Sequence, residues 1–455
     1  MKTSPYARRL SLILALTMTC ALSMGCITGN SSSSGSTSGT AGSSTTTTTS
    51  GTSTVTTVTT SSASTMVTLL DASDQFTNRD LTQTADLSAA TYLTVTSGED
   101  IHITQAGVYV LSGTATDVTV YVEAADEDKV QLVLDGVSIT NSDMPAIYVL
   151  TADKVFVTTT AGSANTLKVT GTFTKGSAVI HSKSDLVLNG LGTLTITSTQ
   201  GKGIKCSDDL KITGGTYVIS SYSHAIDAND SIRICDGTFT ITSSNKDGLH
   251  AENEDDDSLG YIYICGGTFT ITAASDGLEG DAFVVIDGGT FTIKAAEGIE
   301  GTYVQINGGT ISIVATDDGI NASSKSKSYA MTIEINDGDI TVNMGSGDTD
   351  AIDSNGNLYI NGGTLTITAQ SPFDYDGVGQ LNGGTVIVNG SRVTTLSNQF
   401  MGGGQMGGFG RRGSNGWDGN MQAPDMGQPP RVWCPCRRFL CQRLRTPHMW
   451  GHHLP

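Results

Sequence analysis

The sequence has few charged residues, few prolines and almost no tryptophan. Charged residues make up 15% of its 455 residues, with 9 prolines and 3 tryptophans, whereas glycine occurs 55 times. After residue 26, no continuous stretch spaces its apolar residues with the 3.6-residue period of a helix. These absences argue against a helical bundle and favour a protein built from strands. The eight cysteines are scattered and fit no disulfide framework.

Basic residues are also scarce in the central part of the chain. Residues 67–430 hold 17 basic residues and all 44 acidic residues, which leaves a formal charge of −27. A surface this acidic repels a phosphate backbone. We therefore expect no nucleic-acid partner.

An internal repeat occupies residues 261–322. Its three copies are YIYICGGTFTITAASDGLEG, DAFVVIDGGTFTIKAAEGIEG and TYVQINGGTISIVATDDGINA. Apolar and polar residues alternate around a Gly-Gly pair, as expected for half-buried strands whose successive side chains point to opposite faces. Three short strands in about 20 residues predict one coil of a parallel β-helix. Such coils must stack, because no coil can bury its own apolar face.

The same register extends over nine coils. The residue that opens the second strand of each coil is Thr193, Thr216, Thr238, Thr268, Thr290, Thr310, Asp339, Thr364 or Thr385. Two polar inserts, residues 251–260 and 323–330, lengthen the repeat, and we expect them to leave the stack as loops. The predicted fold is all-β, a single-stranded parallel β-helix with about 20–22 residues per coil.

The N-terminus has the features of an export signal. Lys2, Arg8 and Arg9 precede the apolar run LSLILALTMTCALSMGC, which is too short for a typical membrane-spanning helix. Ser-Met-Gly-Cys26 resembles a lipobox, so we interpret residues 1–26 as a signal peptide with lipidation at Cys26; plain secretion is the alternative. Residues 27–66 are almost entirely Ser, Thr and Gly and predict a flexible linker. The folded part would then work outside the cell.

Composition divides the rest of the chain. We assign residues 67–192 to an N-terminal cap with irregular first coils, and residues 193–400 to the regular coils. Residues 401–430 form a tail rich in Gly, Gln and Met. Residues 431–455 are rich in Arg, Cys and His, and their spacing matches no zinc-ligand pattern. We expect this terminus not to fold.

Two columns of the repeat are interpreted as structural. The first is an inward column of apolar residues: Tyr217, Phe239, Phe269, Phe291, Ile311, Ile340, Leu365 and Val386. The second lies before the turn and consists of Asp287, Asn307, Asn336, Asn361 and Asn382, whose side chains can bond the backbone or the neighbouring coil. Cys235 and Cys265 occupy this second position in earlier coils, and there free thiols are favoured over a disulfide.

A column of threonines should cover the outer face of the second strands. The candidate ligand-binding residues on it are Thr238, Thr240, Thr268, Thr270, Thr290 and Thr292. One interpretation is that β-branched residues simply suit strands. The other is a regular array of hydroxyl groups for a polysaccharide or for ice.

The third strand of each coil supplies a column of carboxylates. The candidate metal ligands, taken from the position after its buried residue and from the preceding turn, are Asp227, Asp247, Asp276, Glu279, Glu297, Glu300, Asp318 and Asp353. Stacked carboxylates repel one another, and calcium, which takes six to eight oxygen ligands, would relieve that repulsion. A solvated acidic edge, or carboxylates bonded to turn amides, is the alternative.

Catalysis is the less favoured interpretation. A uronate lyase needs calcium and a basic residue beside it, and a hydrolase needs two carboxylates at a defined separation. The basic residues of the coils are few (Lys205, Lys211, Arg233, Lys246 and Lys294), and none pairs with a second one on an obvious groove wall.

Residues 67–400 resemble the clostridial-type extracellular carbohydrate-binding β-helix proteins, which are similar in fold to pectate lyases. The resemblance rests on DKVQLVLDGVSITNSDMPAIYV (128–149), ADKVFVTT, the serial GGTFTIT and DGI copies, and the Gly/Gln/Met tail. It implies a right-handed parallel β-helix with calcium at the coil turns. It also implies binding of plant cell-wall polymers such as cellulose or polygalacturonate.

The expected function is therefore calcium-dependent polysaccharide binding by a monomer at the bacterial cell surface, with membrane attachment only through the N-terminal lipid. A calcium-dependent pectate lyase-like enzyme is the first alternative. A surface adhesin, or an ice-binding protein that uses the threonine face, is the second.

Overall fold

The computed structural model describes residues 69–345 and 349–398. The expected signal peptide with Cys26, the linker at 27–66, and the segments 401–430 and 431–455 lie outside these residues. The helix found in the described part is a single 3-10 turn, η2 (Ala72–Asp74). No helix there is long and apolar enough to cross a membrane.

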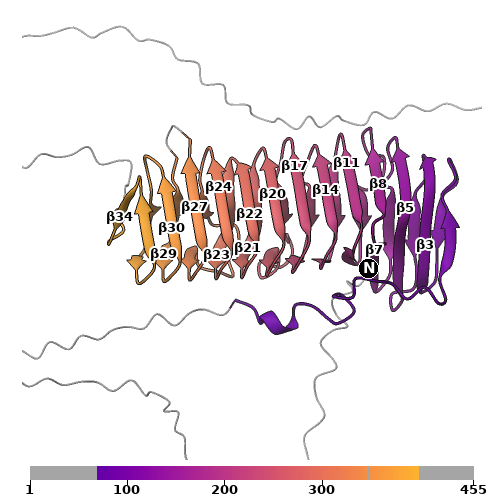
Figure 1. Cartoon of the computed structure of the whole chain (residues 1–455), viewed down its shortest axis with the longest axis horizontal. Coiled ribbons are helices and arrows are strands. Elements are labelled where there is room, and N and C mark those ends of the chain that lie inside the picture. The colour runs from indigo at the N-terminus through magenta and orange to yellow at the C-terminus, as the bar shows by residue number, and fades with distance from the viewer. Residues whose placement is uncertain (1–68, 346–348, 399–455) are drawn as a thin grey trace, which may run out of the picture. The chain divides into compact units, whose positions relative to one another are not determined.

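The strands form one hydrogen-bonded system of 34 members (Figure 1). Along the stack, strands pair in parallel with the strand two or three places further along the chain, as β10 pairs with β13, β13 with β16 and β20 with β22. The chain therefore winds into stacked coils, as the repeat predicts. The described strand pairs are parallel apart from β33 and β34, which are antiparallel. The pairings follow three ladders along the stack.

The first ladder contains β1 (Thr91–Thr94), β3 (Gly107–Thr116), β5 (Lys129–Asn141), β7 (Lys154–Thr159), β10 (Asp185–Gly190), β13 (Asp209–Ile212), β16 (Ser231–Ile234), β19 (Tyr261–Ile264), β21 (Asp276–Ile286), β23 (Glu297–Ile306), β26 (Thr332–Ile335), β29 (Asn357–Ile360) and β32 (Gly379–Leu381).

The second ladder contains β8 (Ala164–Val169), β11 (Thr193–Ser198), β14 (Thr216–Ser221), β17 (Thr238–Ser243), β20 (Thr268–Ala273), β22 (Thr290–Ala295), β24 (Thr310–Ala315), β27 (Asp339–Met344), β30 (Thr364–Thr368), β33 (Thr385–Val388) and β34 (Ser391–Val393). The second halves of β3 and β5 also belong to it.

The third ladder contains β2 (Ile101–Ile103), β4 (Val120–Glu123), β6 (Ile147–Thr151), β9 (Ala178–Ser182), β12 (Lys202–Cys206), β15 (Ile226–Ala228), β18 (Leu249–Ala251), β25 (Ile320–Ala322), β28 (Ile352–Ser354) and β31 (Asp374–Tyr375). The first halves of β21 and β23 also lie in it.

The register predicted from the repeat is confirmed along the second ladder. Each residue expected to open a second strand, from Thr193 to Thr385, pairs with its counterpart in the next coil. The inward column is buried, and the rings of Phe239, Phe269 and Phe291 stack in parallel with successive centroids 4.6 Å apart. Offset aromatic stacking along the axis therefore holds the core coils in line.

The amide column before the turn is also confirmed. Asn307 Nδ2 donates to Asp287 Oδ1 at 2.8 Å, and the same bond continues from coil to coil through Asn336, Asn361 and Asn382 at 2.7–2.8 Å. The turn that follows contains a glycine with positive φ, such as the 111° of Gly289, a conformation that L side chains rarely adopt. Cys235 and Cys265 are free thiols.

Residues 69–83 lie across the outer surface of the first ladder rather than within the coils. Phe76 contacts the ring of Tyr263 with centroids 6.4 Å apart, whereas Asp80 pairs with Lys211 of an earlier coil at 3.3 Å. The segment thus runs against the direction of the stack and covers apolar side chains of the first ladder. Nothing in its short, non-repeating sequence predicts this packing.

Candidate functional site

One side chain from each strand of the third ladder forms a continuous column along the stack. Its members, in register, are His102, Tyr121, Tyr148, His181, Lys205, Asp227, His250, Glu279, Glu300, Asn321, Asp353 and Asp374. From Tyr121 to Asp353 each follows a buried aliphatic residue, so strand alternation turns it away from the core. The column changes from aromatic to basic and then to acidic along the axis.

A cavity of about 610 Å³ opens at the acidic part of this column. Its acidic lining includes Asp247, Asp276, Glu279, Glu297 and Glu300. Five of the eight predicted metal ligands therefore share one cavity, although they come from three successive coils. The other three, Asp227, Asp318 and Asp353, are not among the residues that line it.

Three carboxylates converge on one side of the cavity. Asp276, Glu297 and Glu300 each place an oxygen within 4.8 Å of the others. Burial, reinforced by the charges of Asp247 and Glu279, raises the pKa of Asp276 to about 9. Burial and the charge of Glu300 raise the pKa of Glu297 to about 7. Like charges held together out of water explain both shifts.

Asn321 contacts two of these carboxylates. Its Nδ2 donates to Glu297 Oε2 at 2.9 Å and to Glu300 Oε1 at 3.3 Å. Asn321 is only 7% exposed, and its Oδ1 is buried without a hydrogen-bond partner. The site therefore contains an unused oxygen acceptor beside the carboxylates.

Lys325 provides the positive charge closest to this group. It comes from the insert at 323–330, and its Nζ contacts Glu279 Oε1 and lies 2.8 Å from Glu300 Oε2. Burial opposes the charge on Lys325, but hydrogen bonds to the two carboxylates outweigh it and raise the pKa of the ammonium group. Sequence analysis placed this insert on a loop and did not predict a role for it. No repeat register extends into an insert, so only its basic composition could have served as a signal.

Asp318 and Asp353 lie further along the stack. Oδ1 of Asp318 accepts a hydrogen bond from the backbone N–H of Asp350 at 3.1 Å. Burial, followed by neighbouring carboxylates, raises the pKa of Asp318 and of Asp353 to about 7 each. They form a second acidic position beyond the cavity.

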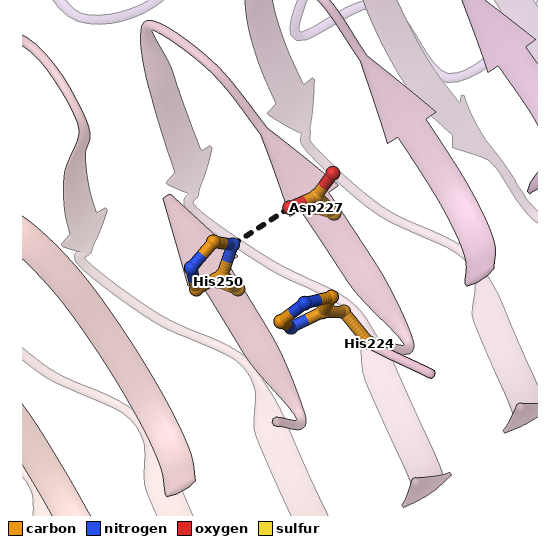
Figure 2. Close-up of side chains that lie close together, drawn as sticks. All are labelled: His224, Asp227 and His250. Atoms are coloured by element: carbon orange, nitrogen blue, oxygen red, sulfur yellow. Dashed lines mark hydrogen bonds and ion pairs between the residues drawn. The ribbon is translucent and has the colours of Figure 1, made fainter. Parts of the chain in front are cut away.

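Asp227 has a different environment from the other candidates. It is 1% exposed, and its Oδ2 lies 2.5 Å from Lys202 Nζ and 2.7 Å from Lys205 Nζ. Its Oδ1 lies 2.7 Å from His250 Nδ1 (Figure 2). Burial opposes the charge, but these three cationic or donor groups lower the pKa of Asp227. Two lysines thus converge on one carboxylate, although neither of them lines the cavity. The sequence did not point to Lys202, because this residue lies at the start of β12 and not at the position that follows the buried residue of each third strand.

His224 is a further residue that sequence analysis missed. It occupies the turn position that later coils fill with Asp247, Asp276 and Glu297, so aligning that position one coil earlier would have found it. Its Nδ1 lies 2.7 Å from Asp247 Oδ2, close enough for an ion pair but not aligned for a hydrogen bond.

The threonine face lies on a different side of the coils. Thr238, Thr240, Thr268, Thr270, Thr290 and Thr292 are all exposed, and each pairs in register with its neighbour. The six threonines of this face contribute nothing to the lining of the carboxylate cavity. The face is a regular outer surface of hydroxyl and methyl groups.

Fold and site together define an all-β protein of stacked parallel strands with a polar, carboxylate-lined cavity on one ladder. A family model for carbohydrate-binding domain-containing proteins matches residues 97–349 and 297–398. The chain belongs to this carbohydrate-binding family.

A curated relative from Acetivibrio thermocellus is also described as a carbohydrate-binding domain-containing protein. It is 36% identical over 132 residues, which cover 28% of this chain and 46% of the relative. The chain thus matches less than half the length of this relative. A solved structure, described as the polysaccharide lyase-like protein from C. thermocellum in a gadolinium derivative, is 23% identical with a TM-score of 0.31. That match covers 66% of this chain and 94% of the other.

Proposed function

We propose that this protein binds a plant cell-wall polysaccharide, polygalacturonate or cellulose, and that calcium at the turns of the third ladder takes part in the binding. The observation that carries the proposal is the convergence of Asp276, Glu297 and Glu300 inside a cavity of a protein from a carbohydrate-binding family. Two buried carboxylates and one half-buried carboxylate in one place destabilise the protein unless protons or cations neutralise them.

The donor atoms at this position suit calcium. Calcium takes oxygen ligands from carboxylates and amides in flexible arrangements. Asn321 lies against Glu297 and Glu300, and a rotation of its amide would turn the partnerless Oδ1 toward the cation. The bound ion would supply positive charge that a carboxylated or hydroxylated sugar can share.

Charge constrains the choice of polysaccharide. Residues 67–430 carry a formal charge of −27, so a polyuronate is repelled unless a divalent cation bridges the two chains. A neutral glucan escapes this repulsion and can stack on aromatic rings instead. Tyr121, which stacks on His102 with centroids 4.9 Å apart, lies in the same column as the carboxylates and offers such a surface.

Affinity electrophoresis tests this proposal. Native gels that contain polygalacturonate, a soluble cellulose derivative or no glycan are run with calcium or with EDTA. We expect retardation on at least one glycan, and on polygalacturonate we expect EDTA to abolish it. A Glu297→Gln, Glu300→Gln double variant should lose the calcium-dependent part, whereas Asp337→Asn, at an exposed turn of the first ladder, should not. The proposal fails if no glycan retards the wild type.

A lyase remains the second candidate, because Lys246 and Lys325 both line the cavity that holds the carboxylates. Lyase action needs a neutral basic group, and the raised pKa of Lys325 keeps its ammonium group protonated while Glu279 and Glu300 flank it. We therefore favour binding over catalysis. Release of an unsaturated product that absorbs in the ultraviolet from polygalacturonate would reverse this preference.

The proposal also covers where the protein works and which hand its coils have. We infer that the protein works outside the cell, attached through Cys26, and that its coils are right-handed, the hand of nearly all parallel crossovers. Adhesion between cells, or ice binding by the exposed threonine face, is the remaining alternative; inhibition of ice recrystallisation would support the latter.

A further inference from the structure

Two buried histidines that line the cavity have no part in the proposed calcium position. His224 and His250 come from successive coils, and their rings stack with centroids 4.2 Å apart and an interplanar angle of 26° (Figure 2). Each residue is only 8% exposed. A state in which both imidazoles carry a positive charge is unfavourable when the rings lie this close together and out of water. A metal ion, which binds the neutral imidazole nitrogen, would therefore suit them.

Asp227 fixes the orientation of His250. The carboxylate of Asp227 is held by Lys202 and Lys205 through Oδ2, and its Oδ1 lies 2.7 Å from His250 Nδ1. A carboxylate clamped in this way accepts the Nδ1 proton, which leaves Nε2 as the nitrogen that faces the cavity. Metal-binding histidines commonly have such a carboxylate on their other nitrogen, where it sets the tautomer and the ring orientation.

The Nε2 side of His250 is open to a ligand. Among the described residues Nε2 makes no hydrogen bond, and its nearest carboxylate oxygens are Glu252 Oε2 at 3.7 Å and Glu279 Oε2 at 3.8 Å. Both distances are longer than a hydrogen bond. They are close to the distance between two ligand atoms of a tetrahedral zinc ion, which is roughly 3.4 Å when the zinc bonds are about 2.05 Å long. Asp247, His250 and Glu279 offer ligand atoms that all lie within 4.8 Å of one another.

The remaining contacts leave these donors available. Lys325 contacts Oε1 of Glu279, so Oε2 is the oxygen that faces His250. Asp247 accepts the backbone N–H of Asp276 through Oδ1 at 3.1 Å, and its Oδ2 lies 2.7 Å from Nδ1 of His224. Calcium prefers a ligand set made only of oxygen, whereas imidazole combined with carboxylate suits zinc and other first-row transition metals.

We propose that His250 Nε2, Asp247 and Glu279, with His224 as the fourth donor, bind one first-row transition-metal ion such as zinc. The ion lies beside, and is distinct from, the proposed calcium position at Asp276, Glu297 and Glu300. Asp227 is a positioning residue that holds His250 in the binding tautomer. The inference does not depend on carbohydrate binding.

Zinc binding to the full chain tests the inference. Metal-stripped protein is dialysed against zinc with excess calcium, and bound zinc is counted by elemental analysis and titrated by calorimetry. We expect His250→Ala to lose one equivalent, with affinity at least 100-fold lower, and Asp227→Asn to weaken binding about 10- to 100-fold. His102→Ala is the matched control, because His102 also pairs with a carboxylate, Glu123, but stands 53% exposed in an early coil.

Two further measurements keep the test decisive. Cobalt substituted for zinc reports the donor atoms, since thiolate ligation by residues 431–455 would add near-ultraviolet charge-transfer absorption that nitrogen and oxygen donors lack. Asp276→Asn should retain zinc while losing calcium. Circular dichroism and thermal unfolding verify that each variant is folded. Equal zinc binding by folded His250→Ala and wild type, or no zinc bound to the wild type, would overturn the inference.

Discussion

Lys325 Nζ lies 2.8 Å from Glu300 Oε2 and also contacts Glu279, so one ammonium group from an insert bridges carboxylates of two successive coils. This insert also contacts the other polar insert, residues 251–260, because Ser326 Oγ donates a hydrogen bond to the backbone carbonyl of Asp257. Lys325 thus neutralises part of a buried acidic column in which calcium would do the same. At the proposed calcium position the two cations would compete for Glu300.

Replacement of this lysine should expose that competition. We expect Lys325→Met to destabilise the metal-free protein by roughly 1–3 kcal/mol, because Glu279 and Glu300 lose their partner inside the fold. Calcium should bind the variant more tightly than the wild type and restore its stability. Thermal unfolding with and without calcium measures both effects. Lys327→Met is the control, since Lys327 belongs to the same insert but is 89% exposed. Weaker calcium binding by Lys325→Met would contradict the competition.

Asp276→Asn should separate calcium binding from stability. The pKa of Asp276 is raised to about 9, so at neutral pH its metal-free carboxyl is protonated and resembles an amide. We therefore expect the variant to be as stable as the wild type without metal. With calcium at 100 times its dissociation constant, the free energy of unfolding of the wild type should rise by about 2.7 kcal/mol, and that of the variant should not. A calcium-induced rise in melting temperature that survives the substitution would exclude Asp276 as a ligand.

Metal-free stability should fall as pH rises. In the unfolded chain these carboxyl groups titrate near pH 4, whereas the pKa of Glu297 and of Asp318 is raised to about 7 in the fold. Between these values the folded state keeps protons that the unfolded state has lost, so the free energy of unfolding decreases with pH. For Asp276 the decrease continues to about pH 9. Melting curves in EDTA from pH 4 to 9 measure this trend, and calcium should flatten it. A stability that rises steadily over this range would refute the explanation.

The amide ladder should contribute more in its middle than at its end. Asn336 donates to Asn307 at 2.8 Å and accepts from Asn361 at 2.7 Å, whereas within residues 69–345 and 349–398 the side chain of Asn382 makes only the bond to Asn361 at 2.8 Å. We expect Asn336→Ala to lower the free energy of unfolding by roughly 1–3 kcal/mol and Asn382→Ala by less than about 1 kcal/mol. Urea unfolding measures both, and equal losses would show that the coil-to-coil bonds do not set the difference.

The polysaccharide should follow the third ladder rather than the threonine face. We expect Tyr121→Ala to weaken binding to a cellulose derivative roughly three- to tenfold, the loss of a stacking surface worth about 0.5–1.5 kcal/mol. Thr270→Lys, at the centre of the exposed threonine face, should leave binding unchanged. Affinity electrophoresis of both variants decides between the two faces, and the reverse pattern would move the binding site to the second ladder.

Much of the fold follows from local sequence. Alternation around the Gly-Gly turn decides which side chains face inward, and a shift of one residue would turn the phenylalanine column out to solvent. The register from Thr193 to Thr385, the buried aromatic column and the amide ladder could therefore be predicted. The carboxylate column could be predicted for the same reason, because equivalent positions of a repeat become neighbours when coils stack.

The repeating part of the protein thus follows from its sequence: the strand register, the inward and outward columns, and the acidic side chains of the third ladder. Which charges meet depends on the tertiary structure. Lys325 reaches Glu300 from an insert, Lys202 and Lys205 converge on Asp227, and residues 69–83 pack back along the first ladder. None of these contacts repeats from coil to coil. The periodicity of a sequence predicts only contacts that repeat, so it could not predict these.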